Sequence, residues 1–86
     1  MDLLEREAEA KLVIRLQAND ESALAELYER LGAKVFTLAI NMLNSHEEAE
    51  EVLQDTFLKL YRGASGFSVE GGSARAFLYT IARNEC

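Results

Sequence analysis

The sequence has no proline, no tryptophan and a single cysteine, Cys86, at its last position. One cysteine cannot form an internal disulfide, which excludes a disulfide-stabilised scaffold and favours a reducing compartment. No apolar run is long enough to span a membrane, and the acidic N-terminal segment is unlike a secretory signal. We therefore expect a cytoplasmic protein that has no membrane partner.

The groups that catalysis or metal binding requires are also scarce. His46 is the single histidine, and the Glu-x-x-His spacing of carboxylate metal bundles is missing. Cys86 and His46 could act as nucleophile and base only if the chain terminus met the start of another helix. The glycine-containing segments lack the lysine of a phosphate-binding loop and follow no strand. We expect no enzymatic activity, no metal site and no cofactor.

Basic side chains are few, because the 86 residues include nine Lys and Arg against fifteen Asp and Glu, giving a net charge of −6. This balance argues against general binding of nucleic-acid backbones, which depends on lysine and arginine. The charge is unevenly distributed: residues 1–58 carry −8 and residues 59–86 carry +2. Two partners of opposite charge would explain this split, and so would an ordinary soluble surface.

Helical periodicity occupies most of the chain. A weak pattern covers residues 2–17, with Val13 and Ile14 off register from an apolar stripe formed by Leu4, Ala8, Leu12 and Leu16. A strong pattern covers residues 20–43, where Asn19 or Asp20 can cap the helix. The second half of this helix is apolar around most of its circumference, which predicts that it is the central and most buried helix. The core residues expected along the whole of residues 20–43 include Leu27, Leu31, Val35, Leu38, Ala39 and Met42.

A third helix is predicted over residues 45–62, where Ser45 and Glu48 form a capping-box signature. The two-residue link Asn44-Ser45 predicts an antiparallel hairpin with the preceding helix. One face carries a stripe that we expect to be buried: Ala49, Val52, Leu53, Phe57, Leu60 and Tyr61. The opposite face is mostly acidic but includes Leu58. An apolar residue among acids favours a protein partner, although single exposed leucines are common.

Four glycines and three serines mark residues 63–73 as a loop, and loops of this length are often functional. Phe67 and Val69 either take part in that function or pack back onto the bundle. Ser73 caps a last helix whose expected buried stripe is Ala74, Phe77, Leu78, Ile81 and Ala82. The other side of this helix carries Arg75, Tyr79, Thr80, Arg83 and Asn84. An aromatic ring between two arginines is typical of surfaces that bind single-stranded nucleic acid, and also of ordinary helix surfaces.

The predicted fold is all-α: a small bundle of about four helices with a central antiparallel hairpin and a loop before the last helix. Residues 1–86 form one domain. The pattern is still helical at Cys86, so we expect a fragment of a longer chain.

Together these motifs resemble region 2 of bacterial RNA polymerase sigma factors, in particular the extracytoplasmic-function group of the sigma-70 family. The resemblance covers residues 20–86 and rests on A-L-x-x-L-Y-x-R, E-E-A-E-E-V-x-Q-D-x-F-L-K-x-Y-R and F-L-Y-x-I-A-R-N at their observed separations. This chain has Phe77 where the family often has tryptophan, and Gly71-Gly72 make its loop more flexible than usual.

The resemblance implies a transcription initiation factor domain that docks on the clamp coiled coil of the polymerase largest subunit. It also implies that the domain recognises and melts the promoter minus-ten element as single-stranded DNA. The implied polymerase-binding residues are Glu51, Gln54, Asp55 and Leu58. The implied DNA-binding residues are Lys59, Arg62, Phe67, Ser68, Arg75, Tyr79, Thr80, Arg83 and Asn84. An anti-sigma factor is a further candidate partner. The alternative hypothesis is a sigma-like helical interaction module without a DNA-binding role.

Overall fold

The structure is a computed structural model that describes residues 3–86. It contains four α-helices: α1 Leu3–Gln17, α2 Ser22–Leu43, α3 His46–Gly63 and α4 Ala74–Glu85. No strand occurs in this part of the chain, so the predicted all-α bundle is confirmed. The helix start expected at Asp2 lies outside the described residues.

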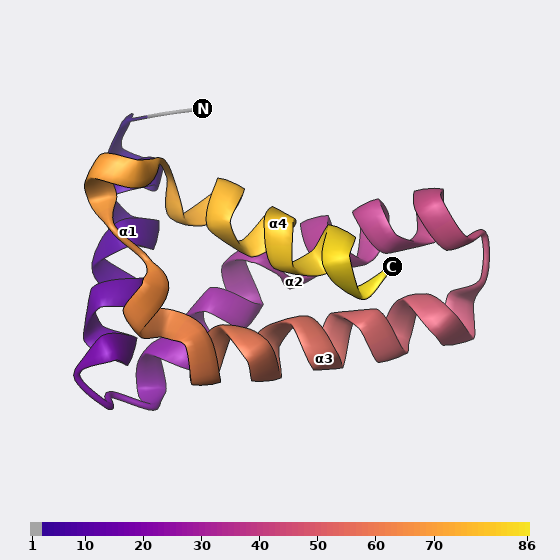
Figure 1. Ribbon diagram of the computed structural model, residues 1–86, viewed down its shortest axis with the longest axis horizontal. Helices are drawn as coiled ribbons and strands as arrows, with labels where there is room; N and C mark the ends of the chain where they lie inside the picture. The colour runs from indigo at the N-terminus through magenta and orange to yellow at the C-terminus, as the bar shows by residue number, and fades with distance from the viewer. Residues whose placement is uncertain (1–2) are drawn as a thin grey trace.

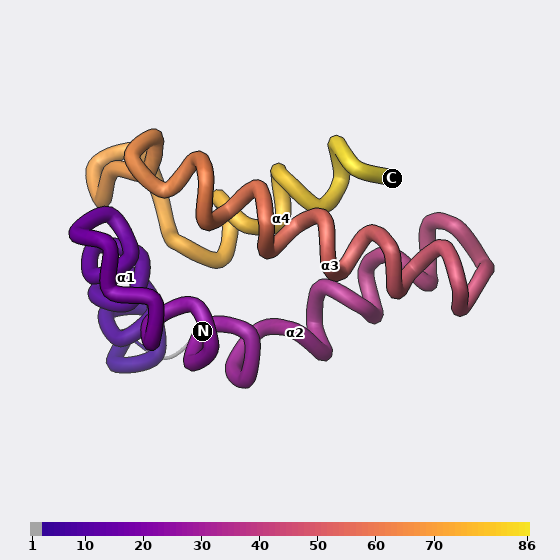
Figure 2. The backbone as a smooth tube through the Cα atoms, turned by 90° about the horizontal axis from the view of Figure 1, so that it is seen from below, coloured from indigo at the N-terminus to yellow at the C-terminus, as the bar shows by residue number. Residues whose placement is uncertain are grey.

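The helices α2 and α3 run antiparallel, and α1 lies across the open end of the pair (Figure 1). Asn44 makes the tight connection possible because it adopts the left-handed conformation, with φ 53°, and its N–H donates to the Ile40 carbonyl. The Ser45 hydroxyl then accepts from the Glu48 N–H at 3.3 Å, which confirms the predicted cap of α3. Figure 2 shows α4 returning along the hairpin, and the segment that precedes α4 passing beside α1.

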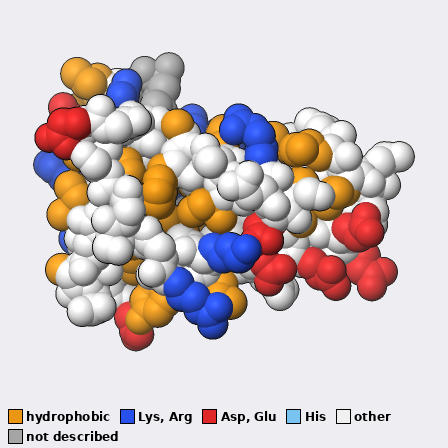
Figure 3. All heavy atoms as spheres, in the orientation of Figure 1, with side chains coloured by type: hydrophobic (Ala, Val, Ile, Leu, Met, Phe, Trp, Pro, Cys, Tyr) orange, Lys and Arg blue, Asp and Glu red, His pale blue; other side chains and the backbone are white. Residues whose placement is uncertain are grey.

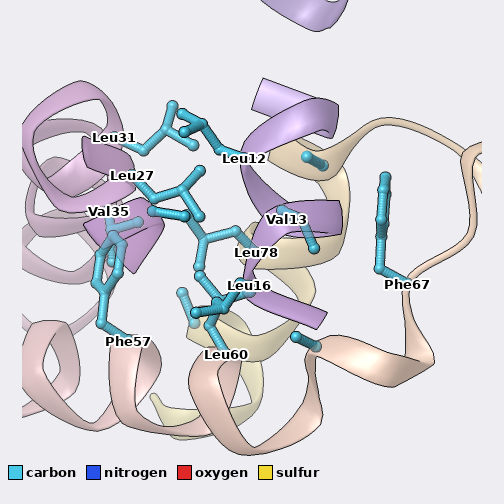
Figure 4. Close-up of a cluster of buried hydrophobic side chains, with 14 residues drawn as sticks. Leu12, Val13, Leu16, Leu27, Leu31, Val35, Phe57, Leu60, Phe67 and Leu78 are labelled. Atoms are coloured by element: carbon cyan, nitrogen blue, oxygen red, sulfur yellow. The ribbon is translucent and has the colours of Figure 1, made fainter. Parts of the chain in front are cut away.

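The main core lies where α1 meets the other three helices (Figure 4). Its large members are Leu12, Val13 and Leu16 of α1, Leu27, Leu31 and Val35 of α2, Phe57 and Leu60 of α3, and Leu78 of α4. The predicted register of α1 was wrong at two places, because Val13 is 1% exposed and Leu4 is 71% exposed. The face of α1 that meets the bundle is centred on residues 9, 12, 13 and 16. On this face, only the second half of α1 is covered by other helices.

The buried stripe of α2 differs from the predicted one at Leu38 and Met42. Leu27, Leu31 and Val35 are at most 1% exposed, whereas Leu38 is only half-buried and Met42 is 52% exposed. The closed end of the hairpin projects beyond α1 and beyond the end of α4 in Figure 1. That end holds a smaller core of Ala39, Ala49 and Val52 between α2 and α3.

On α3, the structure corrects the predicted stripe at its C-terminal end. Tyr61 is 38% exposed, and its hydroxyl donates to the Glu21 carboxylate at 3.2 Å. This hydrogen bond raises the pKa of Tyr61 above its ordinary value. A tyrosine at the edge of a core can bury its ring edge while its hydroxyl reaches a polar partner. Thr56, which the apolar pattern omitted, is fully buried.

The segment between α3 and α4 is more ordered than a plain loop. It contains two short 3₁₀ turns, Ala64–Gly66 and Val69–Gly71. Phe67 packs back onto the bundle and is 7% exposed, whereas Val69 is 56% exposed. Gly72 has φ 134°, a conformation that favours glycine, and Ser73 caps α4 by accepting from the Ala76 N–H at 3.1 Å.

Candidate functional site

The predicted docking residues lie together on the exposed side of α3. Glu51, Gln54, Asp55 and Leu58 follow one another at helical spacing, and all four are exposed. Leu58 is 44% exposed and belongs to neither core cluster. Acidic side chains gather over the N-terminal half of α3 in Figure 3, and basic ones over its C-terminal half. On the surface of α3, Leu58 therefore lies at the border between an acidic region and a basic region.

A pocket of about 250 Å³ opens between the 63–73 segment and α4. Phe67 and Ser68 contribute to one wall, and Phe77 and Thr80 to the other. The two phenyl rings lie 5.5 Å apart between centroids and are tilted by 59°. The Thr80 hydroxyl donates to the Ala76 carbonyl, so its oxygen keeps a free acceptor site at the rim. This pocket combines apolar walls with polar groups at its edge, as ligand pockets commonly do.

Phe67 lies at the border of the core rather than in its middle (Figure 4). Its ring is carried by the segment after α3 and is set apart from the leucines that fill the bundle centre. At 7% exposure, the side chain can form a wall of the pocket but cannot project from the surface as a free anchor. A bound group would therefore contact one face or edge of this ring.

The structure divides the DNA-binding residues predicted on α4 between two flanks. Thr80 faces the pocket, and Asn84 follows it by one turn on the same side. Arg75 and Tyr79 lie on the other flank, where they line a groove against Lys34 of α2. Both Thr80 and Asn84 are exposed, whereas Tyr79 is half-buried against the core. A single DNA strand that follows one flank of α4 would therefore not make equivalent contacts with the residues on the other flank.

Arg75, one of the predicted DNA-binding residues, forms an ion pair within the bundle, so its guanidinium is less available to a phosphate than that of an unpaired arginine. Its guanidinium donates to the Glu9 carboxylate at 2.7 Å and lies 4.0 Å from the Glu5 carboxylate. The Glu9 side chain is 3% exposed and that of Arg75 is 21% exposed. The hydrogen bond to Glu9 raises the pKa of Arg75 further above its ordinary value. This ion pair fastens α4 to α1.

Glu9 is the sequence signal that points to this ion pair. Glu9 lies three residues before Leu12 and four before Val13, so it occupies the buried face of α1. A glutamate on such a face requires a cationic partner.

The remaining predicted cations differ in their availability. Lys59 forms an ion pair with Glu85 at the end of α4. Arg62 and Arg83 are exposed, and neither forms an ion pair with any residue in the range 3–86. These two arginines are therefore the ones most accessible to a phosphate backbone.

Residues 3–86 contain neither a candidate metal site nor a helix that could cross a membrane. No group of three or more His, Cys, Asp or Glu side chains is arranged to hold a metal ion there. Over the same residues, no helix has both the length and the apolar character that crossing a membrane requires.

Comparison with known proteins gives consistent matches. The sequence model of Sigma-70 region 2 matches residues 27–86. The ECF RNA polymerase sigma factors SigK of Mycobacterium tuberculosis (strain ATCC 25618 / H37Rv) and Mycobacterium bovis (strain BCG / Pasteur 1173P2) are each 35% identical over 71 residues. That alignment covers 83% of this chain and 38% of each relative. SigK of Mycolicibacterium vanbaalenii is 32% identical over 71 residues, covering 83% of this chain and 36% of that relative. No solved structure matches. The chain thus spans little more than a third of the length of these relatives.

Proposed function

This chain belongs to the Sigma-70 region 2 family, and from that premise we propose that it docks on the clamp coiled coil of RNA polymerase and recognises the promoter minus-ten element as single-stranded DNA. The observation that carries the proposal is the separation of two surfaces on one small bundle. The docking residues lie on the exposed side of α3, and the pocket lies between the 63–73 segment and α4. One protein partner and one nucleic-acid partner can therefore bind at the same time.

The docking part of the proposal rests on Leu58 and its acidic neighbours. A leucine that is half-exposed in the free domain contributes favourable binding free energy when a partner buries the rest of its apolar surface. Asp55 lies three residues before it, so a basic partner would meet a carboxylate beside the apolar anchor. Apolar anchors of this kind carry much of the affinity of an interface, while charges at the rim set its association rate and salt dependence.

Replacing Leu58 by alanine is expected to weaken polymerase binding about tenfold, mainly by faster dissociation. Asp55→Asn should instead reduce the salt dependence of association. The measurement is surface plasmon resonance against immobilised polymerase core at several salt concentrations. Ile14→Ala is the matched control, because Ile14 is 46% exposed against 44% for Leu58 but lies on α1. If the Asp55/Leu58 double variant binds as well as the wild type, the docking surface lies elsewhere.

The DNA part of the proposal explains how an acidic protein can recognise a nucleic acid. Stacking of unpaired bases on aromatic rings contributes about 1 to 3 kcal/mol per base, and it needs no positive charge. A base extruded from an already melted strand could enter the pocket beside Phe67 and Phe77. Arg62 and Arg83 would hold the backbone, since neither is paired with a carboxylate among residues 3–86.

Two kinds of variant should separate backbone binding from base recognition. Arg83→Gln should weaken binding to every oligonucleotide and lower the magnitude of the salt slope by about 1, because it removes one phosphate contact. Thr80→Val should change which base is preferred at one position, because it removes an acceptor at the pocket rim. Fluorescence anisotropy with single-stranded minus-ten oligonucleotides, varied one base at a time, measures both effects.

Thr37→Val is the matched control for the pocket variant. The Thr37 hydroxyl donates to the Ala33 carbonyl at 2.9 Å, just as the Thr80 hydroxyl donates to the Ala76 carbonyl at 3.0 Å. Both side chains are exposed on a helix, but Thr37 is on α2 and lines the groove of Arg75 and Tyr79 instead of the pocket, so it controls for the pocket alone. Equal losses for all oligonucleotides in the Thr80 variant would show that the pocket does not select a base. Intact polymerase binding with no DNA binding at all would favour the interaction-module alternative.

A further inference from the structure

We infer that Gln17, at the end of α1, is a positioning residue for the pocket and thereby sets its base selectivity. This inference rests on the proposed function, because selectivity has meaning only if the pocket receives a base. Gln17 lies before residue 27, where the match to the Sigma-70 region 2 model begins. The carrying observation is a pair of hydrogen bonds that joins this side chain to the 63–73 segment.

The Gln17 side-chain amide donates to two backbone carbonyls, those of Ala64 at 2.8 Å and Phe67 at 3.0 Å. These carbonyls mark the start of the first 3₁₀ turn and the residue just after it. The Phe67 N–H also donates to the Ala64 carbonyl at 3.0 Å. An amide group has two N–H donors, so one side chain can hold both carbonyls at once. Gln17 therefore fixes the backbone from which the Phe67 ring extends.

The opposite wall of the pocket is also fastened to α1. Arg75 lies on α4, directly before Ala76 and Phe77, which line the pocket. Its ion pair with Glu9 holds the first turn of α4 against α1. Glu9 and Gln17 thus anchor the two walls of one pocket to the same helix. The spacing between the walls depends on α1, even though α1 lines no part of the pocket.

The need for such an anchor follows from the composition of the segment. Residues 63–73 contain four glycines, and each glycine increases the number of backbone conformations available to a free loop. A pocket wall that samples several positions can still allow a base to stack, but it cannot hold a polar atom at a fixed distance from the base edge. Loss of the anchor should therefore reduce discrimination between bases more than overall affinity.

The experiment compares the whole chain with Gln17→Ala and Gln17→Glu variants. Gln17→Glu keeps the shape of the side chain but places a carboxylate, an acceptor without N–H donors, against the two carbonyls. Glu7→Ala is the control, because it truncates an exposed side chain of similar length on the same helix. The readouts are amide hydrogen exchange of residues 63–73 and the ratio of Kd values for the best and worst base at the selected oligonucleotide position.

In both Gln17 variants we expect the Phe67 amide, which donates to the Ala64 carbonyl, to exchange about tenfold faster, as loss of about one net hydrogen bond implies. The selectivity ratio should fall about fivefold, while the Kd for the worst base changes less than twofold. The Glu7 variant should match the wild type in both readouts.

Unchanged exchange and an unchanged ratio in both Gln17 variants would overturn the inference. A uniform loss of affinity with a constant ratio would also overturn it, because that result describes a purely structural residue. If the wild type discriminates no base at all, the proposed function fails together with the selectivity role of Gln17. Amide exchange would then decide by itself whether Gln17 orders the segment.

Discussion

Replacing Phe57 by alanine is expected to lower the free energy of unfolding by about 3 to 5 kcal/mol. The Phe57 side chain is 5% exposed, and its ring meets Tyr28 in an edge-to-face contact with 5.1 Å between centroids. Small domains have a total stability of only about 5 to 15 kcal/mol, and a domain of this size lies near the lower end. The variant should therefore be largely unfolded at 37 °C, as circular dichroism during urea titration would show.

The matched control for this variant is the next residue in the chain. Leu58→Ala also truncates a large apolar side chain on α3, but Leu58 is 44% exposed and belongs to no core cluster. It should change stability by no more than about 0.5 kcal/mol. Equal urea midpoints for the Phe57 and Leu58 variants would show that the core has been placed on the wrong face of α3.

Replacing Arg75 by alanine is expected to destabilise the fold by about 3 kcal/mol. The change leaves the Glu9 carboxylate, which is 3% exposed, without its cation. The expected loss of stability is at the lower end of the range for buried ion pairs because the Arg75 side chain is 21% exposed. Urea denaturation of the wild type, the single variants Glu9→Met and Arg75→Met and the double variant Glu9→Met/Arg75→Met would give the coupling energy.

The double variant should be much more stable than Arg75→Ala, because it removes the buried charge together with its partner. One oxygen of Glu9 and the Nε of Arg75 have no hydrogen-bond partner among residues 3–86, which limits what the pair contributes beyond an apolar contact. Arg83→Ala provides the control on the same helix, since Arg83 is exposed and should leave stability nearly unchanged. If both arginine variants unfold at the same urea concentration as the wild type, the α1–α4 ion pair contributes nothing to the fold.

The sequence by itself determined the helices and the caps of two of them. Ser45 and Ser73 cap α3 and α4 as predicted. These are local effects, because a cap depends on residues two or three positions away. The cap of α2 expected at Asn19 or Asp20 was wrong, because Glu21 occupies the N-cap position and no side chain caps the helix there. Periodicity also identified the inward faces of α3 and α4, since the side-chain direction around a helix axis follows from residue number. The grouping of the docking residues on one side of α3 follows from the same rule.

Only the tertiary structure decided which neighbour each face meets. Arg75 and Arg83 have the same spacing from Tyr79, yet Arg75 meets Glu9 of α1 while Arg83 stays exposed. Lys59 meets Glu85 in the same way. Met42 is 52% exposed although the sequence around it is apolar. The closed end of the α2–α3 hairpin extends past α1 and α4, which cover the rest of the hairpin. Periodicity gives the direction of a side chain around the axis of its own helix. Burial and ion pairing depend instead on where a second helix crosses the first, and that crossing involves residues far apart in the chain.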